Sequence, residues 1–157
     1  MRFIVIVFVL FLVETGYSQT DEAKEKLANQ MIEAMHTLDK EIFIQAKPTI
    51  EMWKVIDPEG TVDLTDQEIE EKFIDNKNLS FSYGNIVESV KKENIAREEI
   101  KFESYDYEEL GGTPVAMTVF FRYKEKKGSI WFSIVTYNHK LYLNEIKNSY
   151  MIFSQME

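Results

Sequence analysis

The stretch SIWFSIVTY, residues Ser129–Tyr137, decides the fold class of this chain. Side chains of a β-strand alternate between its two faces, so Ile130 and Phe132 share one face, and Trp131 and Val135 share the other. One apolar face is enough to build a core against helices. The second apolar face predicts a pocket wall, a docking surface or a layer of the fold lying over the sheet. We therefore expect neither Trp131 nor Phe132 to be simply exposed to solvent.

Three more segments have the same composition, rich in β-branched and aromatic residues. They are IKFESYDYEEL (100–110), TPVAMTVFFRYKEK (113–126) and KLYLNEI (140–146). The predicted turns between the strands are Gly111-Gly112, Lys127-Gly128 and Asn138-His139. Such short connections join neighbouring antiparallel strands, so the sequence predicts a four-stranded meander. The hydrophobic pattern leaves open which face of the sheet meets the rest of the protein.

Before the strands, apolar residues recur at helical spacing. Between Asp21 and Leu38 they recur every three or four positions, which predicts an amphipathic helix with Asp21 as its N-cap. Asp39 is predicted to cap a second, short helix. Pro48 is predicted to lie in the first turn of a third helix, where its missing N–H costs nothing.

Two further helical segments precede the strands. Thr65 followed by Glu68 forms a capping-box pattern, which predicts a helix start. Helical spacing resumes from Leu79 to Val90, although Gly84 weakens that pattern. The order of helices first and strands afterwards is typical of an α+β protein, with the helices packed on one face of the sheet.

The N-terminus has the pattern of an export signal. Arg2 precedes an unbroken apolar run from Phe3 to Val13, and small residues stand at Gly16 and Ser18. The run is too short for a membrane-spanning helix, which needs about 20 residues. We therefore expect residues 1–18 to be a cleaved signal peptide and residues 19–157 to form a single α+β domain. Without a cysteine there is no lipobox, so the expected localisation is secreted or periplasmic.

Charge and composition exclude several classes of partner. The net charge is -9, and an acidic chain is repelled by nucleic acid and by anionic membrane surfaces. We expect no nucleic-acid partner, and no membrane contact after signal cleavage. The chain has no cysteine, so no disulfide supports the domain, which at this size buries enough surface to be stable without one.

Helices followed by a strongly curved antiparallel meander resemble the cystatin-like fold and, within it, the nuclear transport factor 2-like superfamily. MIEAMHTLDKEIFIQ (31–45) is similar to that superfamily's opening helices, and SIWFSIVTYNHKLYLNEI (129–146) to its closing hairpin. The chain departs from the pattern by lacking an early hairpin between the helices. The resemblance implies a pocket between helices and sheet, and pairing of two copies through the other sheet face. It implies no single function, because the fold hosts isomerases, dehydratases and non-catalytic binding modules.

The expected ligand-binding residues are Tyr83, Tyr105, Phe121, Trp131 and Phe132. No catalytic residue, metal ligand or cofactor is assigned. The only histidines are His36 and His139, too few for a compact histidine-based metal site. The loop Asp57–Glu68 places oxygen-bearing residues at the ligand spacing of a calcium loop, but it has Val62 where the sharp turn needs glycine.

The sequence therefore favours an exported, non-catalytic module that binds a small apolar ligand or a protein partner, with a homodimer through the sheet face as one form of that partner. Two alternatives stay open. One is an enzyme of the isomerase or dehydratase type with a pocket between helices and sheet. The other is a secreted inhibitor or accessory subunit that acts through its surface.

Overall fold

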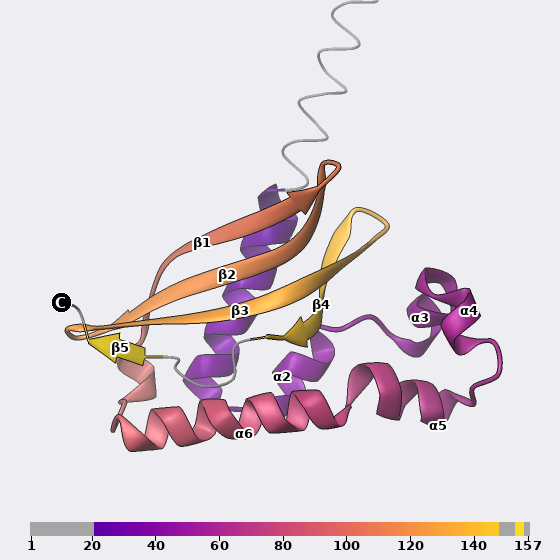
Figure 1. Ribbon diagram of the computed structural model, residues 1–157. Helices are drawn as coiled ribbons and strands as arrows, with labels where there is room; N and C mark the ends of the chain where they lie inside the picture. The colour runs from indigo at the N-terminus through magenta and orange to yellow at the C-terminus, as the bar shows by residue number, and fades with distance from the viewer. Residues whose placement is uncertain (1–20, 148–152, 156–157) are drawn as a thin grey trace, which may run out of the picture.

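The computed structural model describes residues 21–147 and 153–155, and it shows helices followed by an antiparallel sheet (Figure 1). This confirms the α+β prediction. The predicted signal peptide, residues 1–18, lies outside the described residues. In the part of the chain that is described, no helix is long and apolar enough to cross a membrane.

The helical half begins with an N-terminal helix, which is described over residues 21–37. It continues with α2 (Lys40–Gln45), α3 (Ile50–Ile56), α4 (Pro58–Thr61), α5 (Asp66–Ile69), the π-helix η1 (Glu70–Ile74), α6 (Lys77–Lys92) and the 3-10 helix η2 (Arg97–Glu99). The predicted cap of α2 is confirmed, because the Asp39 carboxylate accepts the N–H of Glu41. The capping box of Thr65 and Glu68 is also present, with both of its reciprocal hydrogen bonds.

Two predicted helix starts differ from the structure. Asp21 is itself helical, so it is not the N-cap of the N-terminal helix. Helix α3 begins at Ile50, after Pro48, because the Thr49 hydroxyl accepts the N–H of Met52 and so serves as the N-cap. A threonine side chain offers this acceptor to the helix end, and a proline side chain does not.

Gly84 does not interrupt the last long helix. It lies in α6 with nothing near the position where a side chain would begin. The helix persists because one stripe of it is buried against the core, and burial outweighs the cost of one exposed glycine, about 1 kcal/mol. The buried members of that stripe are Leu79, Ser82, Ile86 and Val90.

The sheet is an antiparallel meander in the order β1 (Lys101–Leu110), β2 (Thr113–Tyr123), β3 (Lys126–Tyr137) and β4 (Lys140–Ile146). This is the predicted four-stranded arrangement. A fifth strand, β5 (Phe153–Gln155), was not predicted and pairs with β3 over Lys126–Gly128. β4 and β5 thus border opposite ends of β3. The two outer strands of the meander are β1 and β4.

Two of the three predicted turns are confirmed. Gly111 and Gly112 both have positive φ, as do Asn138 and His139, which is the geometry of a tight two-residue hairpin. The predicted turn at Lys127-Gly128 is wrong, because Tyr123 pairs with Lys126 and the chain reverses at Lys124 and Glu125. The alternation of β3 therefore continues through Gly128, which lies opposite Phe121.

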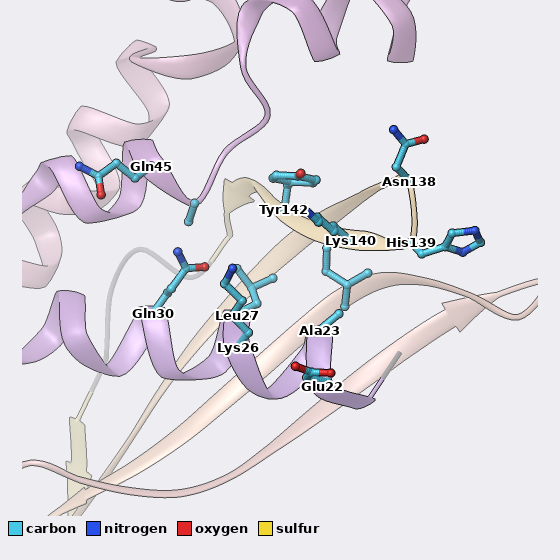
Figure 2. Close-up of a pocket in the computed structure, with 12 residues that line it drawn as sticks. Glu22, Ala23, Lys26, Leu27, Gln30, Gln45, Asn138, His139, Lys140 and Tyr142 are labelled. Carbon is cyan, nitrogen blue, oxygen red and sulfur yellow. The ribbon is translucent and has the colours of Figure 1, made fainter. Parts of the chain in front are cut away.

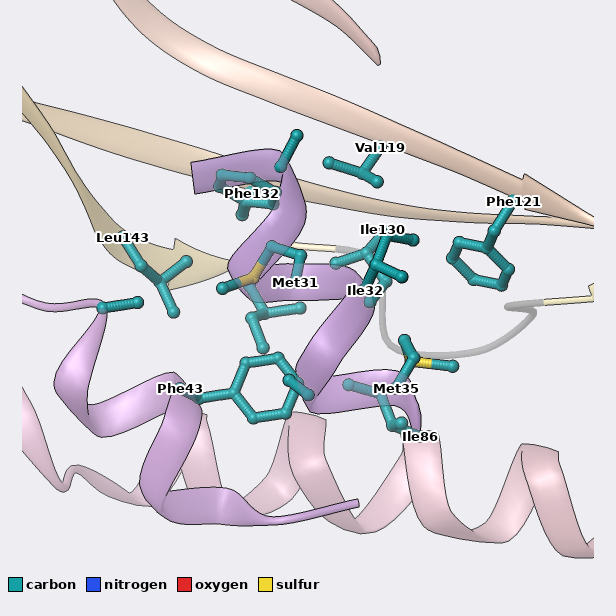
Figure 3. Close-up of a cluster of buried hydrophobic side chains, with 14 of the residues drawn as sticks. Met31, Ile32, Met35, Phe43, Ile86, Val119, Phe121, Ile130, Phe132 and Leu143 are labelled. Atoms are coloured by element: carbon teal, nitrogen blue, oxygen red, sulfur yellow. The ribbon is translucent and has the colours of Figure 1, made fainter. Parts of the chain in front are cut away.

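The main core lies between the sheet and two helices, the N-terminal helix and α6 (Figure 3). Met31 and Met35 of the N-terminal helix face Phe121, Ile130 and Phe132 of the sheet, and all five are completely or almost completely buried. This settles the strand register that the hydrophobic pattern leaves open. The face of β3 that carries Phe132 meets the helices, and the face that carries Trp131 is the outer face.

A second, smaller core lies among α3, α5 and η1. Trp53 of α3 stacks on Phe73 of η1, with ring centroids 4.7 Å apart, and Ile69 and Ile74 complete the buried cluster. Val135 of β3 packs against this cluster, so part of the second face of β3 is covered from inside the chain. One of the expectations for this apolar face was a layer of the fold lying over the sheet. Such a layer is present at the Val135 end of the strand.

Candidate functional site

The five expected ligand-binding residues do not gather around one cavity. Phe121 and Phe132 are completely buried and belong to the packed main core. Trp131 lies on the opposite face of the sheet with 40% of its surface exposed. Because Trp131 and Phe132 are neighbours in one strand, the sheet separates them.

The two tyrosines of the expected set pack against the main core from its sides. The Tyr83 hydroxyl donates to the carbonyl of Leu38 at 2.7 Å, and its ring meets Phe43 edge-on at 6.4 Å between centroids. Tyr105 is half-buried, and this burial raises the pKa of its hydroxyl. Through these contacts Tyr83 attaches α6 to the segment that follows the N-terminal helix, which is a structural role.

An open groove of about 500 Å³ lies between the N-terminal helix, the end of α2 and the β3–β4 hairpin (Figure 2). Its floor is apolar and consists of buried side chains from all three elements: Leu27, Ala46 and Leu141. None of the five expected ligand-binding residues lines it. A concave site of this size is in the range that holds a small organic molecule.

The rim of the groove is polar, and it carries Lys26, Gln30, Gln45, Lys140 and Tyr142. Among the described residues, none of these side chains has a hydrogen-bond or ion-pair partner. Lys26 and Gln30 extend from the helix toward the hairpin, whereas the ring of His139 points away from the groove (Figure 2). The groove therefore combines an apolar floor with polar side chains that form no hydrogen bond within the described residues.

Local structure holds the walls of the groove apart. The tight turn at Asn138 and His139 carries the hairpin out past the N-terminal helix. At the inner end, the backbone N–H of Leu143 donates to the carbonyl of Ala46 at 2.8 Å, which attaches β4 to the end of α2. The N-terminal helix presents Lys26 and Gln30 on one face, because they are four residues apart.

Sequence reasoning missed the groove because its residues come from three distant segments. The spacing of Lys26 and Gln30 is visible in the sequence, but nothing in it indicates that Lys140 lines the same groove. Only the packing of the β3–β4 hairpin against the N-terminal helix brings these groups together.

Lys47 is a second feature that the sequence did not single out. Its side chain is buried, and its ammonium donates to the carbonyl of Phe73 in η1 at 2.8 Å. Burial lowers the pKa of Lys47 to about 8, although nearby carboxylates, Glu145 foremost, favour its charged form. The hydrogen bond attaches the connection between α2 and α3 to the π-helix, and so joins the two halves of the helical region.

His36 and Asp57 were the residues considered for a histidine-based metal site and for a calcium loop, and both form hydrogen bonds within the fold. His36 lies 2.8 Å from the carbonyl of Ile100, to which its Nε2–H donates. The Asp57 carboxylate accepts the N–H of Gly60 and caps α4. Within the described ranges, no group of three or more His, Cys, Asp or Glu side chains is arranged to hold a metal ion.

Comparisons with known proteins give no relative for this chain: no protein-family model, no curated protein and no solved structure matches it.

Proposed function

We propose that this chain is an exported, non-catalytic interaction module that docks a second copy of itself through the outer face of its sheet. The outer face is defined here as the side of β1, β2 and β3 that is turned away from the N-terminal helix. The observation that carries the proposal is the arrangement of side chains on this face, which is apolar at its centre and oppositely charged at its two ends.

The centre of the outer face holds two large aromatic side chains. Phe120 and Trp131 lie on neighbouring strands and are 36% and 40% exposed, although burial of such large aromatic side chains is favourable. Their neighbours in the strand register are small: Ser129 pairs with Phe120, and Thr118 pairs with Trp131. Small residues around two aromatic rings allow another sheet to approach closely, at the usual separation of about 10 Å.

One end of the outer face is cationic. Arg122 pairs with Lys101 on one side and with Lys127 on the other, and residues that pair directly point to the same face. All three side chains are exposed. Arg122 forms an ion pair with Glu103, whereas Lys101 and Lys127 have no ion-pair partner among the described residues.

The other end is anionic. Asp106 pairs with Thr118, and Glu108 pairs with Ala116, so both carboxylates lie on the outer face. Neither forms an ion pair within the described part of the chain, and both are exposed. Arg122 lies six positions after Ala116 along β2, so the two charged ends are about 20 Å apart.

This order of groups is self-complementary under a twofold axis. If the axis lies parallel to the sheet and crosses its strands between Phe120 and Thr118, the cationic end of one copy covers the anionic end of the other. Lys101 then lies over Glu108 of the second copy, and the aromatic centres meet. A C2 dimer uses one surface twice, and few surfaces satisfy this requirement by charge as well as by apolar area.

The edge of the sheet is a less suitable docking place than its face. Strand β1 contains bulges near Glu103 and Glu108, and bulges disturb pairing with a further strand. The Asp106 carboxylate also accepts the backbone N–H of Tyr107 at 2.8 Å, so that donor is already used. Pairing of faces therefore fits the observations better than addition of a strand at β1.

Two further parts of the proposal come from the sequence patterns. Export depends on the apolar run that follows Arg2, and membership of the nuclear transport factor 2-like superfamily depends on helices that precede a meander. The second part is supported in its coarse form by the order of helices and strands.

The test is sedimentation equilibrium of the mature protein, with Trp131→Glu as the main variant. We expect a wild-type dimer and a folded Trp131→Glu monomer with an unchanged circular dichroism spectrum. Phe132→Glu, which places a charge in the main core, should unfold the protein. Val62→Glu is the matched control, because Val62 is 75% exposed, lies at the C-terminal end of α4 and belongs to no strand of the sheet. A wild type that stays monomeric at about 1 mM would overturn the proposal.

A further inference from the structure

A second binding surface is independent of the sheet face. It is the groove between the N-terminal helix, the end of α2 and the β3–β4 hairpin. Its floor consists of the apolar side chains Leu27, Ala46 and Leu141, which also belong to the main core. Because the floor is apolar, a molecule that lies on it displaces little water from polar groups. Burial of the molecule's own apolar surface would contribute about 25 cal/mol for each Å².

The charges on the groove walls differ from those of the chain as a whole. The protein carries a net charge of -9, but the groove is lined by Lys26 and Lys140, and Glu22 is the only acidic side chain among the described residues that line it. Lys26 comes from the N-terminal helix and Lys140 from the hairpin, so lysines of two different elements line the groove. Neither has an ion-pair partner among the described residues. An anionic group bound in the groove would be attracted by both lysines.

Neutral donors and acceptors complete the rim. Gln30, Gln45 and Tyr142 line the groove, and no described residue forms a hydrogen bond with their side chains. An amide or phenol in this position can donate to a carboxylate oxygen without a competing internal bond. The same side chains would give a purely apolar ligand no advantage, so the rim selects for a polar end.

We propose that this groove binds a small carboxylic acid, with its carboxylate between Lys26 and Lys140 and its apolar body on the floor of Leu27, Ala46 and Leu141. The volume of about 500 Å³ suits one molecule of this kind. The site goes beyond docking of a second copy and does not depend on it, because no groove residue belongs to the charged ends or the aromatic centre of the outer face.

The test uses octanoate as the probe, with isothermal titration calorimetry and an NMR titration of the mature protein. We expect saturable binding of octanoate, at least tenfold weaker binding of octanol, and amide shifts in residues 22–30, 45–46 and 138–142. Lys26→Glu and Lys140→Glu should each weaken octanoate binding at least tenfold, whereas Lys26→Arg should retain it. Lys91→Glu, an exposed change at the end of α6, is the control and should leave the affinity unchanged.

Three results would overturn this site. The first is no saturable binding of octanoate by the wild type, and the second is equal binding by wild type, Lys26→Glu and Lys140→Glu. The third is a set of amide shifts that map to other residues. The same titration on Trp131→Glu separates the two proposals, because a folded monomer that binds octanoate normally supports the groove whether or not the wild type dimerises.

Discussion

The ammonium of Lys24 lies 3.4 Å from the centroid of the Tyr107 ring. Lys24 belongs to the N-terminal helix and is only 3% exposed, and Tyr107 belongs to β1. The carboxylates of Asp21 and Glu109 lie 3.6 and 3.7 Å from the same nitrogen. Burial acts to lower the pKa of Lys24, but its contacts with Tyr107 and the two carboxylates outweigh burial, and the pKa is raised. This contact attaches the N-terminal helix to an outer strand of the sheet.

Replacement of the Tyr107 ring should therefore loosen that attachment. We expect Tyr107→Leu to lower the free energy of unfolding by about 1 kcal/mol, the usual size of a partly exposed cation–π contact. Tyr107→Phe keeps the ring face and should cost less than Tyr107→Leu. Urea denaturation at neutral pH measures both variants. Equal losses in the two variants would show that the ring face contributes nothing.

The buried Lys47 should give the protein a specific alkaline pH dependence. Its pKa is about 8 in the folded state, below the ordinary value of 10.5 that applies after unfolding. Between these values the unfolded chain binds a proton that the folded chain has released, so stability rises as the pH rises. We expect this rise to total about 2–3 kcal/mol between pH 8 and 10.5.

Lys47→Met isolates that contribution from other alkaline titrations. The difference in the free energy of unfolding, wild type minus Lys47→Met, should be flat below pH 7 and should increase toward pH 10. Chemical denaturation across this range measures it. A difference that stays constant with pH would mean that Lys47 titrates normally in the folded protein.

Some of these features follow from local sequence, and others do not. The alternation in Ser129–Tyr137 correctly separates Trp131 from Phe132, since side-chain direction in a strand is a local property. The same alternation does not say whether Phe132 lines a cavity or fills a core. That depends on how closely Met31 and Met35 of the N-terminal helix approach the sheet. For this reason the expected ligand-binding set included core residues.

The charged ends of the outer face were also hidden in the sequence. Lys101, Arg122 and Lys127 lie in one row only because of the pairing register of three strands. A turn placed at Lys127-Gly128, as the sequence suggested, shifts that register and removes Lys127 from the row. Hairpin register depends on turn position, and a small error in the turn changes which residues share a row.

Export should leave a defined N-terminus. We expect mass spectrometry of the secreted or periplasmic product to show a chain that begins near Gln19, because the apolar run ends before a small-residue cleavage site. Deletion of residues 3–13 should retain the protein inside the cell. A full-length product that stays embedded in the membrane would contradict this prediction.

Calcium should not affect stability. The Asp57 carboxylate already accepts the N–H of Gly60, and the loop lacks glycine at the position of the sharp turn in a calcium loop. We expect the melting temperature to be the same with millimolar calcium and with chelator. A calcium-dependent increase that disappears in Asp57→Asn would show that the loop binds the ion after all.

The most direct test of the central claim is a charge exchange between Lys101 and Glu108 on the outer face. Under the proposed twofold axis each residue lies over the other in the second copy, so Lys101→Glu and Glu108→Lys should each weaken the dimer at least tenfold in sedimentation equilibrium. The double variant restores both pairs and should recover most of the wild-type dissociation constant. A double variant that dimerises no better than either single variant would contradict docking through this face.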